Sequence, residues 1–505
     1  MTRNRIALSA ALLATTGLVP AGAAWAQEGE SASVQTDDVI VVRYQYVPDS
    51  KRVTSEVSSF LSADDFITTG DSDIADAMSR VTGVTISNGR FPVVRGLNER
   101  YSNTLINGSP LASPEPLLRA APLDLVPTSI VRNVLVQKTF TPQYTAEFGG
   151  GLVEIETSSL PNEGFFDIGV SGSVNTESSF DEGLLHDGGS HDEWGFGDGT
   201  RDIPGEFQEL FQTQRIGTQD ADTLAEFGRS LENSKLWVVQ QGDVPGDVGA
   251  EFAAGERFDF DNMSLGLQVA ASYDNEWRNR FGERGDVTGQ LNTAGELEAV
   301  VNTDYERFST INDITANGLI GAGLEFGDQQ IEALALVLRS TEKETRVELG
   351  NLLPTEDEEF RDDNTEFFER QVYTYQVRGD HVFDALGGLE ADWRWSFSDA
   401  SREAPNQRRA RYEGQPEGSD LTCLPFDPTP EVSNCILRED TRGNEIRFSR
   451  VDEEVTDYGF DLALPVDAFG LAWEWKAGYA YLERERGAYS RALAFAGAST
   501  NDFRS

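Results

Sequence analysis

The chain has 505 residues, of which 39% are hydrophobic and 25% charged, and its formal net charge at pH 7 is −45. This length exceeds one ordinary soluble core, so several domains or one large barrel are expected. The 86 acidic against 41 basic side chains exclude nucleic acid as an expected partner, and three His and two Cys leave little material for metal or thiol chemistry. No cofactor and no enzyme activity are predicted.

Residues 1–26 have the pattern of a secretory signal peptide. Arg3 and Arg5 give a positive start, residues 6–19 are largely apolar, and a cleavage site follows near Ala26. The alternative is a membrane anchor, but the apolar stretch is short and interrupted by hydroxyl side chains. We therefore expect an exported protein.

Residues 27–52 are expected to be a periplasmic linker that contains one short apolar run. This run follows two carboxylates, and the six residues are Asp37, Asp38, Val39, Ile40, Val41 and Val42. Such a segment can add as a strand to the exposed sheet edge of a partner protein. The equally weighted alternative is that it forms the first strand of the next domain.

Residues 53–162 predict a compact α+β domain. Asp73 is placed to cap a helix that begins at Ile74 and ends near Gly83. Asn107 and Gly108 form a strong two-residue hairpin signal. The other expected elements are strands over 84–86, 91–94, 134–136 and 152–157 and a short helix over 127–130.

Residues 163–505 alternate apolar and polar side chains in strand-length segments separated by polar gaps. The segments are 166–174, 265–273, 318–326, 331–338, 372–382, 389–397, 458–464 and 471–481. Aromatic residues recur at one parity within their strands, as in the girdles of outer-membrane barrels. A transmembrane antiparallel β-barrel is favoured over the alternative, a soluble β-sandwich.

Two features of this region bear on metal binding. Cys423 and Cys435 lie in a Pro-rich polar stretch, and in an oxidising compartment they are expected to form a disulfide; a metal site is the weaker alternative. The Gly-rich acidic stretch 187–202, with His186 and His191, could bind a cation. A solvated loop is the preferred interpretation, because no recognised ligand spacing is present. No metal site is predicted.

Several motifs, taken together and in their order along the chain, resemble those of a TonB-dependent outer-membrane receptor. Residues 37–42 resemble the TonB box, and residues 74–84 resemble the first plug helix and its exit, with Thr82 where the family usually has Pro. Asn107 stands where the family more often has Asp. The matching plug-motif residues are Arg95, Gly96, Asn107, Gly108, Lys138, Glu147, Gly149 and Gly150.

The resemblance implies a plug domain followed by a barrel of about 22 strands. Only about ten strands are legible, so the chain is expected to be truncated, lacking roughly half its barrel. Arg95 and Lys138 could pair with wall carboxylates or lie at an ordinary surface. Ligand contacts are expected from the plug apices, at Asn88, Arg90, Phe91, Ser109 and Glu115.

The resemblance also implies the function and the partners. The chain would be a receptor of the cell outer membrane for energised uptake of a scarce ligand, either a ferric siderophore or a carbohydrate such as an oligosaccharide. Its expected partners are the energy-transducing protein TonB, outer-membrane lipid and lipopolysaccharide. The alternative is a passive outer-membrane pore or a surface adhesin barrel without energy coupling.

Overall fold

The computed structural model describes residues 58–494, apart from short gaps. The gaps are 70, 72, 117–120, 141–143, 145–148, 158–159, 162, 213–217, 232–235, 237, 292–295, 353–358, 414–435, 439–440, 442 and 469–470. The predicted signal peptide, the predicted box at 37–42, Glu147, Cys423 and Cys435 all lie outside the described residues.

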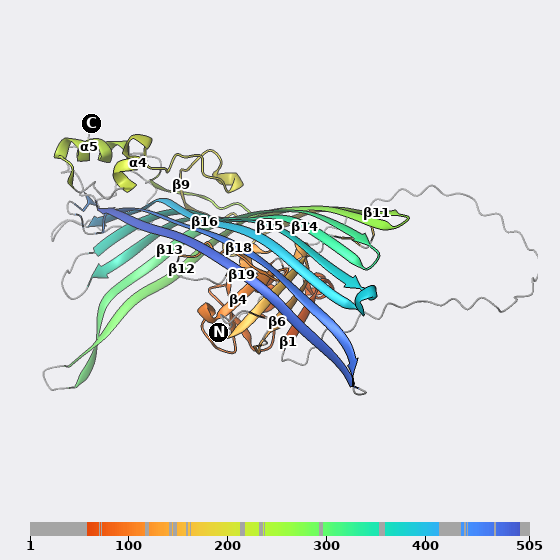
Figure 1. Ribbon diagram of the computed structural model, residues 1–505. Helices are drawn as coiled ribbons and strands as arrows, with labels where there is room; N and C mark the ends of the chain where they lie inside the picture. The colour runs from red at the N-terminus through yellow and green to blue at the C-terminus, as the bar shows by residue number, and fades with distance from the viewer. Residues whose placement is uncertain are drawn as a thin grey trace, which may run out of the picture. The chain divides into compact units, whose positions relative to one another are not determined.

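The N-terminal domain, residues 58–157, is built on a five-stranded sheet with the order β1-β6-β7-β4-β5 (Figure 1). Its only parallel pair is β4 with β7, and β2 and β3 form a separate antiparallel pair. The elements are β1 (Ser58–Ser62), α2 (Ala63–Thr69), α3 (Ile74–Met78), β2 (Val84–Ser87), β3 (Phe91–Val94), η1 (Glu99–Tyr101), β4 (Ser102–Ile106), β5 (Ser109–Pro110), η2 (Leu123–Leu125), η3 (Thr128–Ile130), β6 (Val131–Gln137) and β7 (Gly151–Thr157).

The predicted N-terminal cap of α3 is confirmed. The side chain of Asp73 accepts a hydrogen bond from Asp76 N (2.9 Å), and this caps α3. The helix is shorter than predicted, since it ends at Met78, and Gly83 (φ 77°) lies in the turn that follows it. Ile74, Ala77 and Met78 are fully buried, so the apolar face of α3 is part of the domain core.

The second part of the chain is one large antiparallel sheet, here named the strand wall. Its order is β19-β18-β16-β15-β14-β13-β12-β11-β8, with β17 paired to β16 (Figure 1). Since β8 and β19 are its two edges, the described strands form an open sheet. The strands are β8 (Phe165–Ser173), β11 (Asp247–Phe260), β12 (Met263–Leu291), β13 (Leu297–Phe326), β14 (Gln329–Leu352), β15 (Glu359–Phe383), β16 (Leu389–Glu413), β17 (Ile436–Leu437), β18 (Glu445–Ala468) and β19 (Leu471–Ala494).

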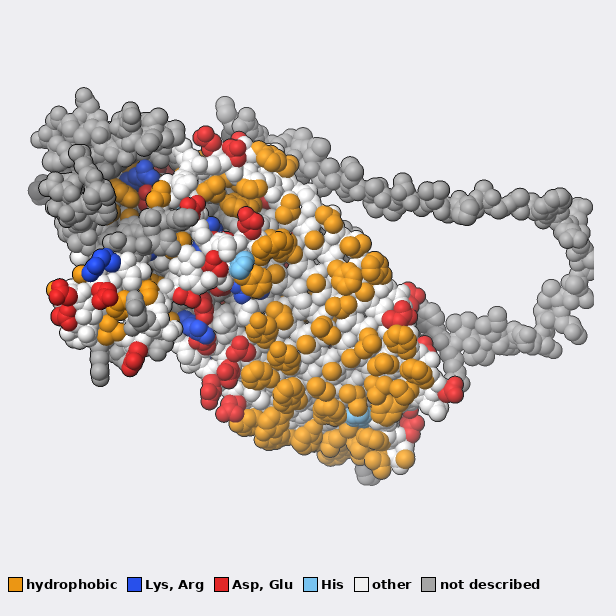
Figure 2. Space-filling model, turned by 90° about the horizontal axis from the view of Figure 1, so that it is seen from above, with side chains coloured by type: hydrophobic (Ala, Val, Ile, Leu, Met, Phe, Trp, Pro, Cys, Tyr) orange, Lys and Arg blue, Asp and Glu red, His pale blue; other side chains and the backbone are white. Residues whose placement is uncertain are grey.

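One face of the strand wall, here named the inward face, contacts the N-terminal domain, and the opposite outward face carries an apolar band. Near the short turns, the outward positions of β12 are Leu265, Leu267, Val269 and Ala271, and on β14 they are Ile331, Ala333, Ala335 and Val337. Trp393 and Trp395 are on the same face of β16. Figure 2 shows hydrophobic side chains gathered over a large part of one face of the molecule. This band matches the lipid-facing surface of a transmembrane barrel.

The long connection between β8 and β11 folds against the outward face beyond the apolar band. It contains β9 (Glu182–His186), η4 (Asp192–Trp194), α4 (Gly205–Gln212), α5 (Ala221–Ser230) and β10 (Val239–Asp243). Its helices pack Phe211 and Phe227 in a cluster with Ile446 and Phe448 of β18. Among the described residues, no helix has the length and apolar character needed to cross a membrane.

Most strand positions predicted from alternation are confirmed, but the strands are much longer than predicted. The expected strand over 265–273 is one third of β12, which has 29 residues. β11 was not predicted at all. A tight turn at Gly327 and Asp328 joins β13 to β14, between the predicted segments 318–326 and 331–338.

Candidate functional site

The turn between β2 and β3 presents Arg90 to the inward face of the strand wall. Asn88 (φ 54°) and Gly89 (φ 70°) both adopt positive φ in this three-residue turn, which lies between the paired residues Ser87 and Phe91. The guanidinium of Arg90 lies 3.1 Å from Asp124 Oδ2 in the same domain and 3.1 Å from Glu342 Oε2 on β14. The turn therefore joins the domain to the strand wall by charge.

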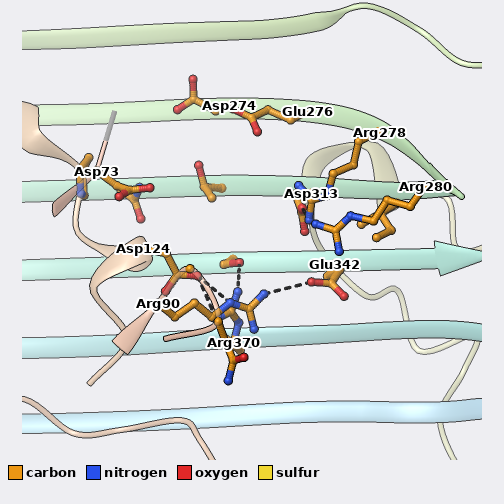
Figure 3. Close-up of a pocket in the computed structure, with 17 residues that line it drawn as sticks. Asp73, Arg90, Asp124, Asp274, Glu276, Arg278, Arg280, Asp313, Glu342 and Arg370 are labelled. Carbon is orange, nitrogen blue, oxygen red and sulfur yellow. Dashed lines mark hydrogen bonds and ion pairs between the residues drawn. The ribbon is translucent and has the colours of Figure 1, made fainter. Parts of the chain in front are cut away.

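A cavity of about 390 Å³ lies between this turn and strands β12 to β14 (Figure 3). Its lining carries four Arg and six carboxylates, an excess of two negative charges if all are ionised. The charged residues are Asp73, Arg90, Asp124, Asp274, Glu276, Arg278, Arg280, Asp313, Glu342 and Arg370. Arg278 forms an ion pair with Asp313 across neighbouring strands. A lining of this kind suits a polar ligand with many oxygen or nitrogen atoms rather than an apolar one.

Arg370 of β15 is the centre of the polar contact below the cavity. Its side chain is almost fully buried, at 1% exposed. Its Nη1 lies 3.2 Å from Asp124 Oδ2 and 3.6 Å from Glu115 Oε1, and its Nη2 donates to Ser340 Oγ (2.8 Å). Each side of the interface thus supplies both signs of charge.

The hairpin of β4 and β5 makes a second set of contacts with the inward face. Asn107 (φ 50°) and Gly108 (φ 79°) form the predicted turn. Asn107 Nδ2 donates to Gln376 Oε1 (3.0 Å), and Gln376 Nε2 donates to Ile106 O (2.9 Å). Ser109 Oγ donates to Asp457 Oδ2 (2.9 Å). These bonds place the hairpin against β15 and β18.

The capping residue Asp73 also lines the cavity. Burial raises the pKa of its carboxyl to about 7, and the nearby charges of Asp76 and Asp124 act in the same direction; the hydrogen bond from Asp76 N opposes them. Asp73 is therefore partly protonated near neutral pH, so the charge of the cavity depends on pH.

The structure brings together two of the five predicted ligand residues. Asn88 and Arg90 line the cavity, whereas Phe91 is buried in the domain. Ser109 is buried in the hairpin contact and Glu115 faces Arg370 outside the cavity lining. Their role in ligand binding stays a prediction.

The other predicted motif residues lie within the N-terminal domain. Arg95 (φ 54°) and Gly96 (φ 74°) form an exposed turn. Lys138 Nζ donates to Ser59 Oγ (2.8 Å) and Thr82 O (2.6 Å), so it contacts its own domain and not a wall carboxylate. Burial lowers the pKa of Lys138, and the charge of Arg95 adds to this effect.

Gly149 and Gly150 pack where a side chain would make unusually close contacts. A Cβ on Gly149 would lie 3.2 Å from Tyr101 Cβ, and one on Gly150 would lie 3.3 Å from Leu97 Cβ. Gly150 N also donates to Tyr101 O (2.8 Å). These glycines allow the start of β7 to approach η1 closely.

Asp124, Glu342 and Arg370 were missed by the sequence analysis. Arg370 has the parity opposite to the outward Tyr375 of β15, and Glu342 has the parity opposite to the outward aliphatic residues of β14, which is a usable signal for inward side chains. Asp124 stands between the fully buried Leu123 and Leu125, an unusual place for a carboxylate. Their partners could not be read from the sequence, because the contacts join distant segments.

In the stretch 187–202, for which cation binding was the less favoured interpretation, Asp192 is occupied by ion pairs with Arg201 and with Lys343 of β14. Arg201 donates to both carboxylate oxygens of Asp192 (2.7 and 2.5 Å), and Lys343 Nζ lies 3.0 Å from Asp192 Oδ2. Burial opposes ionisation there, but the hydrogen bonds and charges of Arg201 and Lys343 lower the pKa of Asp192. In the part of the chain that the structure describes, no cluster of three or more His, Cys, Asp or Glu is placed to hold a metal ion.

Residues 49–152 match the family model of the TonB-dependent receptor plug domain. No curated protein matches the chain.

Several solved structures share a low similarity with the chain. One is the ferric citrate transporter FecA in its unliganded form, with 11% identity, a TM-score of 0.30, and coverage of 87% of this chain and 59% of that chain. The outer membrane transporter YddB from Escherichia coli has 9% identity, a TM-score of 0.27, and coverage of 85% and 77%. The siderophore receptor PirA from Acinetobacter baumannii has 9% identity, a TM-score of 0.28, and coverage of 88% and 81%. The chain spans 59% of the ferric citrate transporter.

Proposed function

We propose, from the premise that this chain carries the plug domain of a TonB-dependent outer-membrane receptor, that it serves energised uptake of a scarce ligand. The plug, residues 58–157 of the described chain, is attached to the inward face of a wall whose outward face carries a lipid-facing band. The outer membrane has no ATP, so uptake against a gradient needs work delivered from the inner membrane. The box at 37–42 is the proposed point where TonB pairs as an added strand.

The polar contact between the plug and the wall is the observation that carries this proposal. Arg90, Asp124 and Glu115 of the plug meet Glu342 and Arg370 of the wall. Water can replace ion pairs and hydrogen bonds when they break. A plug held by such bonds can therefore be displaced without exposing an interface that is entirely apolar. Fully apolar contacts do exist beside it, since Leu336, Leu338 and other inward side chains share a cluster with the plug core.

The ligand is proposed to be a ferric siderophore or a carbohydrate. The cavity beside Arg90 offers guanidinium donors and carboxylate acceptors within one space. Carboxylates and guanidinium groups hydrogen-bond sugar hydroxyls, and the same groups can bind the charged periphery of an iron chelate. Asn88 and Arg90 are the proposed contacts from the plug.

The experiment that tests energy coupling replaces Val41 with Pro. Proline removes one donor from the added strand, so V41P is expected to lose binding of the purified periplasmic domain of TonB to the full chain. Uptake of radiolabelled ferric siderophores by whole cells should be lost as well, while their binding to the cell surface stays. Val34→Pro, in the linker outside the box, is the matched control and should behave as the wild type.

A passive pore or an adhesin would have no use for the box. If V41P binds TonB and takes up its ligand at the wild-type rate, energised uptake through this segment is wrong and the passive alternative is favoured.

A further inference from the structure

Residues Trp194, Gly195 and Phe196, here named the aromatic wedge, are fixed flat against the outward face of the strand wall. Gly195 O accepts hydrogen bonds from Arg339 Nε and Thr341 Oγ1, both at 2.7 Å. Gly195 has φ 75°, and a Cβ there would lie 3.1 Å from Ile314 Cγ2. The backbone therefore approaches the wall closely, in a conformation that favours glycine.

The flanking residues strengthen this attachment. Gly197 N donates to Glu369 Oε1 (2.7 Å), and the guanidinium of Arg339 lies 4.1 Å from the ring centroid of Phe196. Arg339 is also paired with Glu369. The wedge is thus bound to β14 through two buried hydrogen bonds and to β15 through an exposed one, although it belongs to a long connecting segment.

The two rings of the wedge are nevertheless largely open. Trp194 is 62% exposed and Phe196 is 45% exposed. The Trp194 ring lies 5.7 Å from that of Tyr273 on β12, whose hydroxyl donates to Glu193 O (2.5 Å). Two large apolar rings are thus held rigidly at the surface by polar bonds behind them. Such an arrangement indicates a partner surface outside the chain.

The distance between the wedge and the short turns of the strand wall identifies the partner surface. From Met263 at the short turn to Tyr273 is ten residues, about 33 Å along the strand, or about 25 Å at a tilt of about 40°. That is the height of the apolar band of an outer-membrane barrel. The next outward residue, Asn275, is polar and bonded to Asn312. The wedge therefore continues the lipid-facing band at its border on the side of the long connections, which is the external side.

We propose that the aromatic wedge inserts into the outer leaflet of the outer membrane, at the boundary between acyl chains and the headgroups of lipopolysaccharide. Trp is favoured there because its ring is apolar and its N–H is a donor. The wedge would act as an anchor that holds the long connection to the membrane surface. This inference rests on the outer-membrane part of the proposed function and not on energy coupling.

The test places a photoreactive benzoylphenylalanine at single positions of the full chain in the outer membrane of its own host. Position 194 is expected to form adducts with lipopolysaccharide on irradiation. Trp475, 67% exposed in the apolar band near the short turns, is the reference for insertion and should form phospholipid adducts. Ala225 of α5, beyond the band, is the aqueous reference and should form no lipid adduct.

Each outcome of the crosslinking experiment either supports or overturns the proposal. Adducts of position 194 with lipopolysaccharide support the proposal. Adducts with a second copy of the chain, or no adduct while position 475 captures phospholipid, overturn it and leave the uptake function intact. If position 475 captures no lipid, the strand wall does not lie in the membrane, and both proposals fail.

A second measurement guards against a labelled protein that fails to fold. Trp194→Ser combined with Phe196→Ser is expected to lose lipopolysaccharide that copurifies with the wild type. Leu224→Ser on α5 removes an exposed apolar side chain beyond the band and should retain it. Equal retention by both variants contradicts the proposal.

Discussion

At the scale of single residues, the sequence predicts backbone roles better than side-chain partners. Asp73 was assigned as a helix cap, and Asn107 with Gly108 as a turn; both are confirmed, because each role depends on neighbours within a few residues. Lys138 shows that side-chain partners are harder to predict from the sequence. Its position was legible, yet its bonds to Ser59 and Thr82 join segments that are distant in the chain.

The carboxyl of Asp73 is expected to make the plug less stable as pH rises. Its pKa is raised in the folded chain to about 7, from an ordinary 3.8. The folded state therefore binds the proton more tightly than the unfolded state. The stability from this group is fully present below pH 3.8 and is lost as pH rises through 7.

Asp73→Asn keeps a capping acceptor but removes this titration. Hydrogen exchange of the α3 amides in the full chain, corrected for the intrinsic effect of pH, should rise roughly a hundredfold from pH 5 to 8 in the wild type, because each of the two pH units between 5 and the folded pKa of about 7 removes a factor of ten. The variant should show little change. The same rise in both proteins would rule out Asp73 as its origin.

At the scale of elements, alternation reveals only the strand segments that face lipid. On β16 the predicted stretch 389–397 carries outward Trp393 and Trp395, but farther along the same face are Asp399, Ser401 and Glu403. Beyond the apolar band both faces of a strand contact water or polar loops, so the period-two signal disappears while the backbone pairing continues. β11 does carry outward Phe258 and Phe260, but its alternation is interrupted by Ala253 on the inward face and Glu256 on the outward face.

Gly108→Ala is expected to destabilise the plug hairpin. Its φ of 79° is costly for an L side chain, by about 1–2 kcal/mol. Steric contact contributes little, because the new Cβ would lie 3.7 Å from Arg394 Cδ. Faster protease cleavage of the plug in outer membranes is the expected readout.

Gly228→Ala is the matched control for this change. Gly228 lies in α5, has no positive φ and has no atom within 4 Å of a built Cβ. Alanine there should stabilise the helix by about 0.5–1 kcal/mol. If Gly108→Ala is cleaved no faster than Gly228→Ala, the positive φ does not limit the stability of the hairpin.

At the scale of the whole molecule, the plug and the wall are joined by residues that no local pattern connects. Glu342 and Arg370 are on neighbouring strands, and each contacts a plug residue about 250 positions earlier. Parity alone places them on the inward face. Their pairing with Arg90 and Asp124 follows only from the way the plug rests on the sheet, which the sequence does not specify locally.

Arg370→Gln is expected to loosen the plug from the wall. The substitution leaves Glu115 and Asp124 facing a neutral side chain in a buried site, and breaking a buried pair on one side costs about 3–5 kcal/mol. Cells with this variant should admit large hydrophilic antibiotics more readily than cells with the wild type. Arg447→Gln, which removes an exposed ion pair with Glu445, is the control and should leave permeability unchanged.

A double variant separates loss of this pair from general damage. Glu115→Gln added to Arg370→Gln removes the carboxylate whose ion pair was with Arg370, whereas Asp124 keeps its pair with Arg90, so the permeability of the double variant should fall back toward the wild type. Additive damage would mean that the two residues do not act as a pair. Wild-type permeability in Arg370→Gln would mean that the plug is held by the apolar contacts of Leu336 and Leu338, and that displacing it requires those contacts to open first.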